Sequence, residues 1–238
     1  MSAGPLSGQT VAVFGGSSGI GLATAQAARA LGARITIASR TPIRLREAAT
    51  AIGEAQTAAL DIRDAEAVAE FFASRAPFHH VVVSAAELSV GPLRQRSLAD
   101  ERAAMESKFW GAVHVAHAAR ILPEGTLTLV SGMIGTRPTG SATMLSAINA
   151  ALDTLAKALA TEMAPVRVNC VSPGRIETPW WDFLPLAERQ ALFDRTATAL
   201  PLKRIGKPEE IAAQIVHLMR NGFMTGSVVL VDGGGSVA

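Results

Sequence analysis

The stretch VAVFGGSSGIG, residues 11–21, joins a short apolar run to a turn rich in glycine. Residues 22–31 are mostly strong helix formers, so the order strand, glycine turn, helix is predicted. Glycine lets a backbone approach a pyrophosphate closely, and the free N–H groups of the helix's first turn point at it. The stretch therefore predicts a dinucleotide site, with a tight structural turn as the alternative that a single glycine motif leaves open.

Segments typical of strands and helices alternate along the rest of the chain. Further strands are predicted at residues 34–38, 57–60, 80–83, 126–130, 166–171 and 227–231. Helices are predicted at residues 44–52, 65–73 (capped by Asp64), 142–163 and 208–220. A helical region is predicted at 98–120, whereas 179–200 is irregular or helical. This alternation predicts an α/β fold in one domain, residues 1–238, with a parallel sheet covered on both faces. A ligand would bind beyond the C-terminal ends of the strands.

Composition excludes several classes of function. No apolar run approaches the ~18 residues of a membrane span, and residues 1–9 lack the features of a signal peptide. Cys170 is the only cysteine, so no internal disulfide forms, and a cytoplasmic location is expected. The net charge is only +2 and no basic stripe is interleaved with aromatic residues, which argues against a nucleic-acid partner. No cluster has metal-ligand spacing.

Several motifs occur together in a fixed order. They are Gly15 with Gly19-Ile20-Gly21, Asp61, the VRVN of residues 166–169, the SPG of 172–174 and the DGG of 232–234. In order and spacing the chain resembles the classical short-chain dehydrogenase/reductase family from about Gly8 to Gly235. The resemblance implies a Rossmann-type, doubly wound, three-layer α/β/α fold with a seven-stranded parallel sheet. It also implies an NAD(P) cofactor and a homotetramer, or a homodimer.

The same resemblance assigns cofactor-binding residues. They are Gly15, Ser17, Ser18, Gly19, Ile20, Gly21, Asp61, Ile62, Ser84, Ala85, Ala86, Pro173, Gly174, Ile176 and Thr178. By resemblance, Asp61 accepts a hydrogen bond from the adenine amino group; its alternative role is to cap the turn after the third strand. Glu87 departs from the family, which has glycine there.

The end of the second strand indicates which cofactor is used. A carboxylate there would bind the adenosine ribose and reject a 2′-phosphate, but this chain has Ser39 and Arg40. A guanidinium pairs with phosphate in fork geometry, so we expect NADP(H) to be preferred over NAD(H). The alternative is an ordinary solvated arginine, and Ser17 and Ser18 supply no second cation.

The family's catalytic residues are where the chain departs from the pattern. The family uses a tyrosine, a lysine four residues later, a serine about thirteen residues before the tyrosine, and an asparagine on the preceding long helix. Aligned on these motifs, the tyrosine position is Leu145 and the lysine position is Asn149. The serine position falls on Gly132, with Ser131 one place away. The chain contains no tyrosine, so the standard mechanism is excluded.

Lys108 falls on the position of the family's helix asparagine, so the usual amide and ammonium are exchanged between Lys108 and Asn149. An apolar site disfavours the ammonium and lowers its pKa towards the range useful for proton transfer. We therefore name Lys108, Asn149 and Ser131 as candidate catalytic residues. The alternative is structural: Lys108 would satisfy a carbonyl of a kinked helix and bind Asn149.

The remaining site residues are apolar, namely Met133, Met144, Leu145 and the loop of residues 180–184. They favour a small apolar substrate, although the loop could instead close the core. Two functions remain open. The first is an NADP(H)-dependent oxidoreductase acting on an apolar carbonyl, alcohol or activated double bond. The second is a catalytically silent NAD(P)-binding sensor or oligomer partner.

Overall fold

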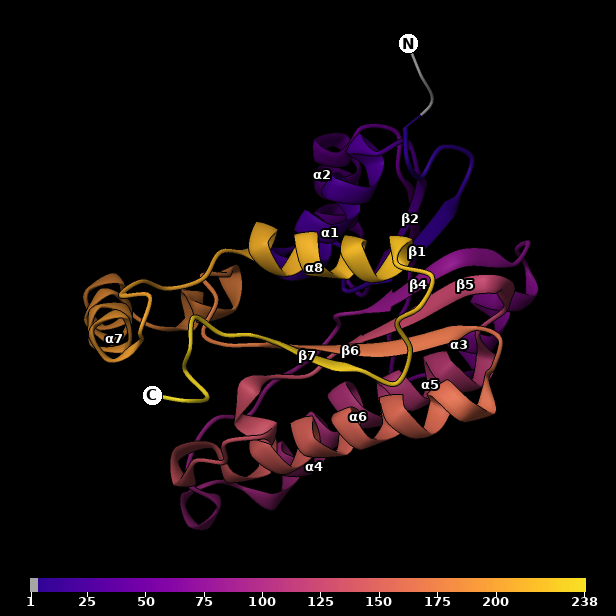
Figure 1. Ribbon diagram of the computed structural model, residues 1–238. Coiled ribbons are helices and arrows are strands. Elements are labelled where there is room, and N and C mark those ends of the chain that lie inside the picture. Colours follow the sequence, from indigo (N-terminus) through magenta and orange to yellow (C-terminus); the bar gives the residue numbers. More distant parts are fainter. Residues whose placement is uncertain (1–3) are drawn as a thin grey trace.

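A computed structural model describes residues 4–238, and its centre is a parallel sheet of seven strands (Figure 1). The spatial order is β3-β2-β1-β4-β5-β6-β7, the doubly wound Rossmann-type arrangement that was predicted. The strands are β1 Thr10–Phe14, β2 Arg34–Ser39, β3 Gln56–Ala59, β4 Phe78–Val83, β5 Ile121–Val130, β6 Arg167–Pro173 and β7 Val228–Val231.

Helices cover both faces of this sheet, which gives the three-layer architecture (Figure 1). One face carries α1 Gly19–Ala30, α2 Pro42–Ile52 and α8 Pro208–Arg220. The other carries α3 Ala65–Ala73, α5 Gly111–Ala118 and α6 Thr143–Glu162, with α4 Leu98–Met105 beside α6. The cap predicted for α3 is present, because the Asp64 carboxylate accepts from the Ala67 N–H at 3.0 Å. Helix α7, Leu186–Ala199, lies beyond the C-terminal end of the sheet (Figure 1).

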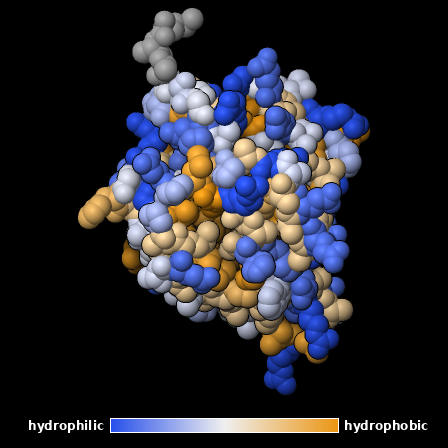
Figure 2. All heavy atoms as spheres, turned by 90° about the vertical axis from the view of Figure 1, so that its right-hand side faces the viewer, coloured by the Kyte–Doolittle hydropathy of each residue, from blue (hydrophilic) through white to orange (hydrophobic). Residues whose placement is uncertain are grey.

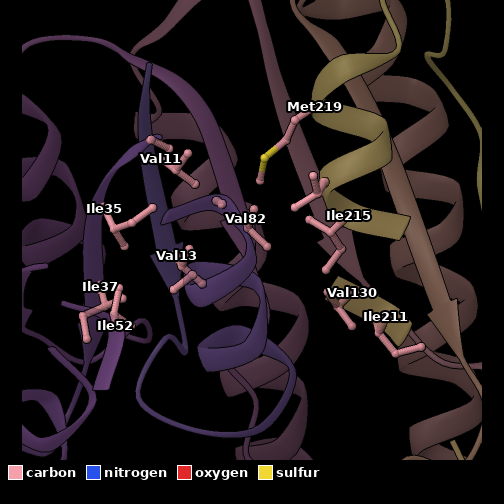
Figure 3. Packing of buried hydrophobic residues seen from close by; sticks show 14 of the residues in the cluster. Val11, Val13, Ile35, Ile37, Ile52, Val82, Val130, Ile211, Ile215 and Met219 are labelled. Atoms are coloured by element: carbon pink, nitrogen blue, oxygen red, sulfur yellow. The ribbon is translucent and has the colours of Figure 1, made fainter. Parts of the chain in front are cut away.

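The alternation of side chains along β1 divides the core into two. Val11 and Val13 face the α1/α8 side, whereas Ala12 and Phe14 face the α3/α6 side. On the first side Ile215 and Met219 of α8 point from the helix towards the strands (Figure 3). Both faces of the strand are therefore buried, as the continuous apolar run of β1 predicts.

The helical region predicted over residues 98–120 is present from Leu98 to Ala118. Within it, a π-helical turn at Glu106–Trp110 separates α4 from α5, a division that was not predicted. A Cβ atom on Gly111 would come within 2.8 Å of the Ile62 side chain, so this glycine lets α5 pack closely against the segment after β3. The π-helical turn places Ser107 and Lys108 in the interior, where both are buried.

Figure 2 shows the face at which the parallel strands begin, the right-hand side of Figure 1. Hydrophilic residues cover most of this face, and hydrophobic residues are visible between them in small groups. Over residues 4–238, no helix combines the length and apolar character needed to cross a membrane. The large cleft of the molecule lies at the opposite end of the strands.

Candidate active site

A cleft of about 740 Å³ lies at the C-terminal ends of the strands. It is bordered by the glycine turn after β1, by the segments after β2, β4 and β5, and by the segment after β6. All residues predicted from the sequence to bind cofactor or take part in catalysis line this cleft, with the exception of Gly21. Gly21 instead packs inside the turn, because a Cβ atom there would collide with the Gly15 carbonyl oxygen. The cleft is where an open α/β sheet binds its ligand.

The glycine turn presents the first turn of α1 to the cleft. Gly15 has a φ of +83° and Gly19 a φ of +51°, in the left-handed region that favours glycine. Ser17, Ser18 and Gly19 all line the cleft. Within the described chain, the Ser18 side chain makes no capping bond to α1. The N–H groups at this helix N-terminus are therefore suitable for an anion.

Charged side chains form the rim where the adenosine end of a dinucleotide is expected. Arg40 donates to the Glu87 carboxylate at 2.9 Å. Arg63 pairs with Asp61 at 2.6 Å and lies 3.6 Å from Glu87. The hydrogen bond from Arg63 holds the pKa of the Asp61 carboxyl below its usual range. Asp61 also accepts from the Arg63 backbone N–H, which is the turn-capping role left open by the sequence.

A second cation, which was not predicted from the sequence, lies at this end of the cleft. Arg44, in the first turn of α2, lines the cleft together with Arg40 and Thr41. Thr41 is the N-cap residue of α2, and within residues 4–238 its side chain makes no capping hydrogen bond to this helix. Two guanidinium groups and a helix N-terminus thus converge on one region. The sequence signal that could have identified Arg44 is its position, a basic residue in the first turn of the helix after the second strand.

Lys108 is buried, with 7% of its surface exposed, yet it lines the cleft. Its Nζ donates to the Ser131 carbonyl oxygen at 2.9 Å. The structural alternative drawn from the sequence named a carbonyl of a kinked helix as the acceptor. That acceptor is wrong, because Ser131 follows strand β5. Burial lowers the pKa of Lys108 to about 8, although Cys170 and Asp153 act in the opposite direction.

Asn149 lies close to the backbone after β5. It is buried, and a Cβ atom on Gly132 would come within 2.8 Å of its Nδ2. Over residues 4–238, Asn149 Oδ1 and Ser131 Oγ are buried without a hydrogen-bond partner. Both residues line the cleft. Unsatisfied buried polar atoms are costly, so these two oxygens fit a site that a ligand or water completes.

Two further polar residues lie behind Lys108 and were not found from the sequence. The Cys170 thiol donates to Asp153 Oδ1 at 3.4 Å, and both side chains are buried. Burial raises the pKa of the Cys170 thiol to about 12, so the thiol is protonated at neutral pH. Asp153 is one helical turn after Asn149 on α6, a spacing that places both on one face of the helix.

Apolar side chains form part of the cleft wall. They include Met133, Leu145, Trp180, Trp181 and Leu200, and the charged Arg137 and Arg175 line the cleft as well. The indole N–H of Trp181 donates to the Ile176 carbonyl at 2.9 Å, which fixes the ring beside the cleft. Met144 and residues 182–184 were assigned to this wall from the sequence but are not among the lining residues.

The fold and the cleft define a Rossmann-type nucleotide-binding oxidoreductase. A family model described as enoyl-(acyl carrier protein) reductase matches residues 15–236. The galactitol 2-dehydrogenase (L-tagatose-forming) of Cereibacter sphaeroides is 32% identical, covering 98% of this chain and 96% of its own length. The chain belongs to the short-chain dehydrogenase/reductase family.

Solved structures agree with this assignment. The L-sorbose reductase of Gluconobacter frateurii, complexed with NADPH and L-sorbose, superimposes with a TM-score of 0.89 at 28% identity, covering all of both chains. A small-chain dehydrogenase in complex with NADPH gives a TM-score of 0.86 at 31% identity, covering 97% of this chain and 99% of that one.

Proposed function

We propose that this chain is an NADP(H)-dependent oxidoreductase that acts on an apolar carbonyl, alcohol or activated double bond through a site without tyrosine. Residues 1–238 form one catalytic domain in this proposal. The observation that carries it is the position of Lys108, a buried ammonium group that lines the cleft together with Asn149. An amine with a pKa near 8 exchanges protons readily at neutral pH.

The residues of the cleft fit a dinucleotide cofactor. The first turn of α1 would hold the pyrophosphate, and Ser84, Ala85 and Ala86 would lie along the adenosine ribose. Pro173, Gly174, Ile176 and Thr178 would hold the nicotinamide end. The unpartnered buried oxygens of Ser131 and Asn149, found within residues 4–238, support a polar ligand at that end. When bound, the nicotinamide supplies or accepts the hydride.

The arginines after β2 support NADP(H) over NAD(H). Arg40 and Arg44 line one end of the cleft, beside the N-terminus of α2. A 2′-phosphate placed there gains charge-assisted hydrogen bonds, whereas a ribose without the phosphate does not. The two solved relatives described above were determined with NADPH, in agreement with this choice.

Proton transfer is assigned to Lys108. In the reduction, its Nζ donates a proton to the substrate oxygen or carbon. In the oxidation, the Nζ accepts that proton back. The Ser131 carbonyl keeps the amine in place through the 2.9 Å hydrogen bond. The Asn149 amide, on the facing helix, binds the substrate oxygen and orients it.

The apolar wall supports the substrate class. Met133, Leu145, Trp180 and Trp181 bury hydrocarbon or aromatic surface without offering charge. A substrate that carries one polar reacting group on an apolar body matches this lining.

A second candidate function is a catalytically silent NAD(P)-binding protein. One observation favours it: the Lys108 ammonium already donates to a carbonyl and has little exposed surface. A lysine held in this way could serve only to stabilise the segment after β5. The cofactor cleft would then act as a sensor.

Absorbance of NADPH separates the two candidates. The purified chain is incubated with NADPH and a panel of quinones, ketones, imines and enones. Oxidation of NADPH with any member, dependent on protein concentration, supports the oxidoreductase. Tight NADPH binding by calorimetry without turnover across the panel would instead support the silent protein.

A further inference from the structure

Four charged side chains form a continuous series on the rim of the cleft. Arg40 contacts Glu87 at 2.9 Å, Glu87 lies 3.6 Å from Arg63, and Arg63 contacts Asp61 at 2.6 Å. The series joins the ends of β2, β4 and β3, which are far apart in the sequence. Its two positive and two negative charges cancel, so the rim is less positive than its arginines alone would make it.

Glu87 is the centre of this series, and its backbone is held from inside the molecule. Its N–H donates to the hydroxyl of Ser107 at 2.8 Å. Ser107 is buried in the π-helical turn, next to Lys108. The fold thus fixes the position from which the Glu87 carboxylate reaches Arg40.

We infer that Glu87 is a specificity-determining residue that weakens the preference of this cleft for a 2′-phosphate, because its carboxylate competes for the Arg40 guanidinium. This inference rests on the proposed use of NADP(H). A phosphate on the ribose must displace the carboxylate from Arg40 or share the guanidinium with it. NAD(H) has no group there and meets no such competition.

The expected size of the effect follows from exposure. The side chains of Arg40 and Glu87 are 53% and 49% exposed, so water screens their attraction. Arg44 has no contact with this carboxylate among the described ion pairs and still attracts the phosphate. Removing the Glu87 charge is therefore expected to strengthen NADPH binding about two- to fivefold.

Calorimetric titration of the full chain with NADPH and with NADH tests the inference. The variants are Glu87→Gln alone, Arg40→Met alone and the two together. The matched control is Glu54→Gln, which removes an equivalent charge from a surface pair with Arg29 at 3.1 Å, outside the cleft lining. Glu87→Gln keeps the size of the side chain and removes only its charge.

We expect Glu87→Gln to lower the Kd for NADPH and to leave the Kd for NADH unchanged. In the Arg40→Met background, Glu87→Gln should not strengthen NADPH binding. Glu54→Gln should change neither Kd. An unchanged NADPH Kd overturns the inference. An equal change in the Kd values of both cofactors also overturns it, because Glu87 would then act on the ribose itself or through its charge on any dinucleotide. Failure of the NADP(H) proposal itself is visible separately, as equal binding of both cofactors by the unmodified chain.

Discussion

The side chain of Asn149 occupies the space that a Cβ atom on Gly132 would need, with the ideal Cβ position 2.8 Å from Asn149 Nδ2. These residues belong to different parts of the fold, since Gly132 follows β5 and Asn149 is on α6. The contact means that the two positions are coupled. A larger residue at position 132 requires Asn149 to move.

The coupling predicts how substitutions combine. Gly132→Ser should destabilise the chain by about 1–3 kcal/mol, because the added atoms meet the buried amide. In an Asn149→Ala background the space is free, so the same change should cost much less. Urea unfolding of the four proteins measures both costs. Equal costs in the two backgrounds would show that the contact is not the cause.

Cofactor preference should depend on Arg40. Arg40→Asp replaces the phosphate partner by a group that repels phosphate and accepts from ribose hydroxyls, so NADH should bind more tightly than NADPH. The loss of NADPH affinity should be about ten- to a hundredfold, the range of a charge-assisted hydrogen bond. Calorimetry with both cofactors measures it. Equal affinities that the substitution leaves unchanged would refute the role of Arg40.

Lys108 should make the free energy of unfolding depend on pH in the alkaline range. Its pKa is about 8 in the folded chain against an ordinary value of 10.5, so the unfolded chain binds more protons between these pH values. The free energy of unfolding should therefore rise with pH in this window, by up to about 3 kcal/mol from this group. Cys170, whose pKa is raised to about 12, acts in the opposite direction above pH 9.

A comparison with Lys108→Met isolates the lysine from the thiol. The difference in unfolding free energy between the two proteins, measured in urea at pH 7 and pH 10, should shift in favour of the unmodified chain as pH rises. A difference that is independent of pH would mean that Lys108 is not a buried ammonium group.

Assembly provides a further prediction. The resemblance implies a homotetramer in which α5 and α6 pack against their copies, and α6 carries small residues such as Ala147, Ala151 and Ala158 on its more exposed side. Small side chains let helices approach closely. Light scattering at micromolar concentration should give the mass of four chains. The mass of one chain would contradict the prediction.

The sequence specified the fold better than the details of the site. The apolar run of β1 and the glycines after it are local features, and both lie where they were predicted. The π-helical turn at Glu106–Trp110 was not predicted, because helix propensity does not distinguish a local π-helical turn from a regular α-helix. The close approach of Gly111 to Ile62 that follows the turn is a tertiary contact, which local propensity does not contain either.

Contacts between side chains far apart in the sequence could not be predicted from the sequence either. Arg40 was found from its place after β2, but its partner Glu87 is 47 residues away and comes close only when β2 and β4 lie in one sheet. Lys108 was identified from its motif, whereas its bond to the Ser131 carbonyl required the geometry of β5. Residue type indicated the chemistry, and the topology determined the partners.

Turnover of Lys108→Met shows whether Lys108 transfers the proton, with Lys207→Met as the matched control, because Lys207 is an exposed lysine before α8 that does not line the cleft. The substrate is whichever compound supports NADPH oxidation by the unmodified chain. Loss of the proton donor should lower kcat by about 10²–10⁴, while the NADPH Kd, the circular dichroism spectrum and the activity of Lys207→Met stay unchanged. Unchanged kcat in Lys108→Met would contradict the proposed proton transfer and leave Lys108 a structural residue.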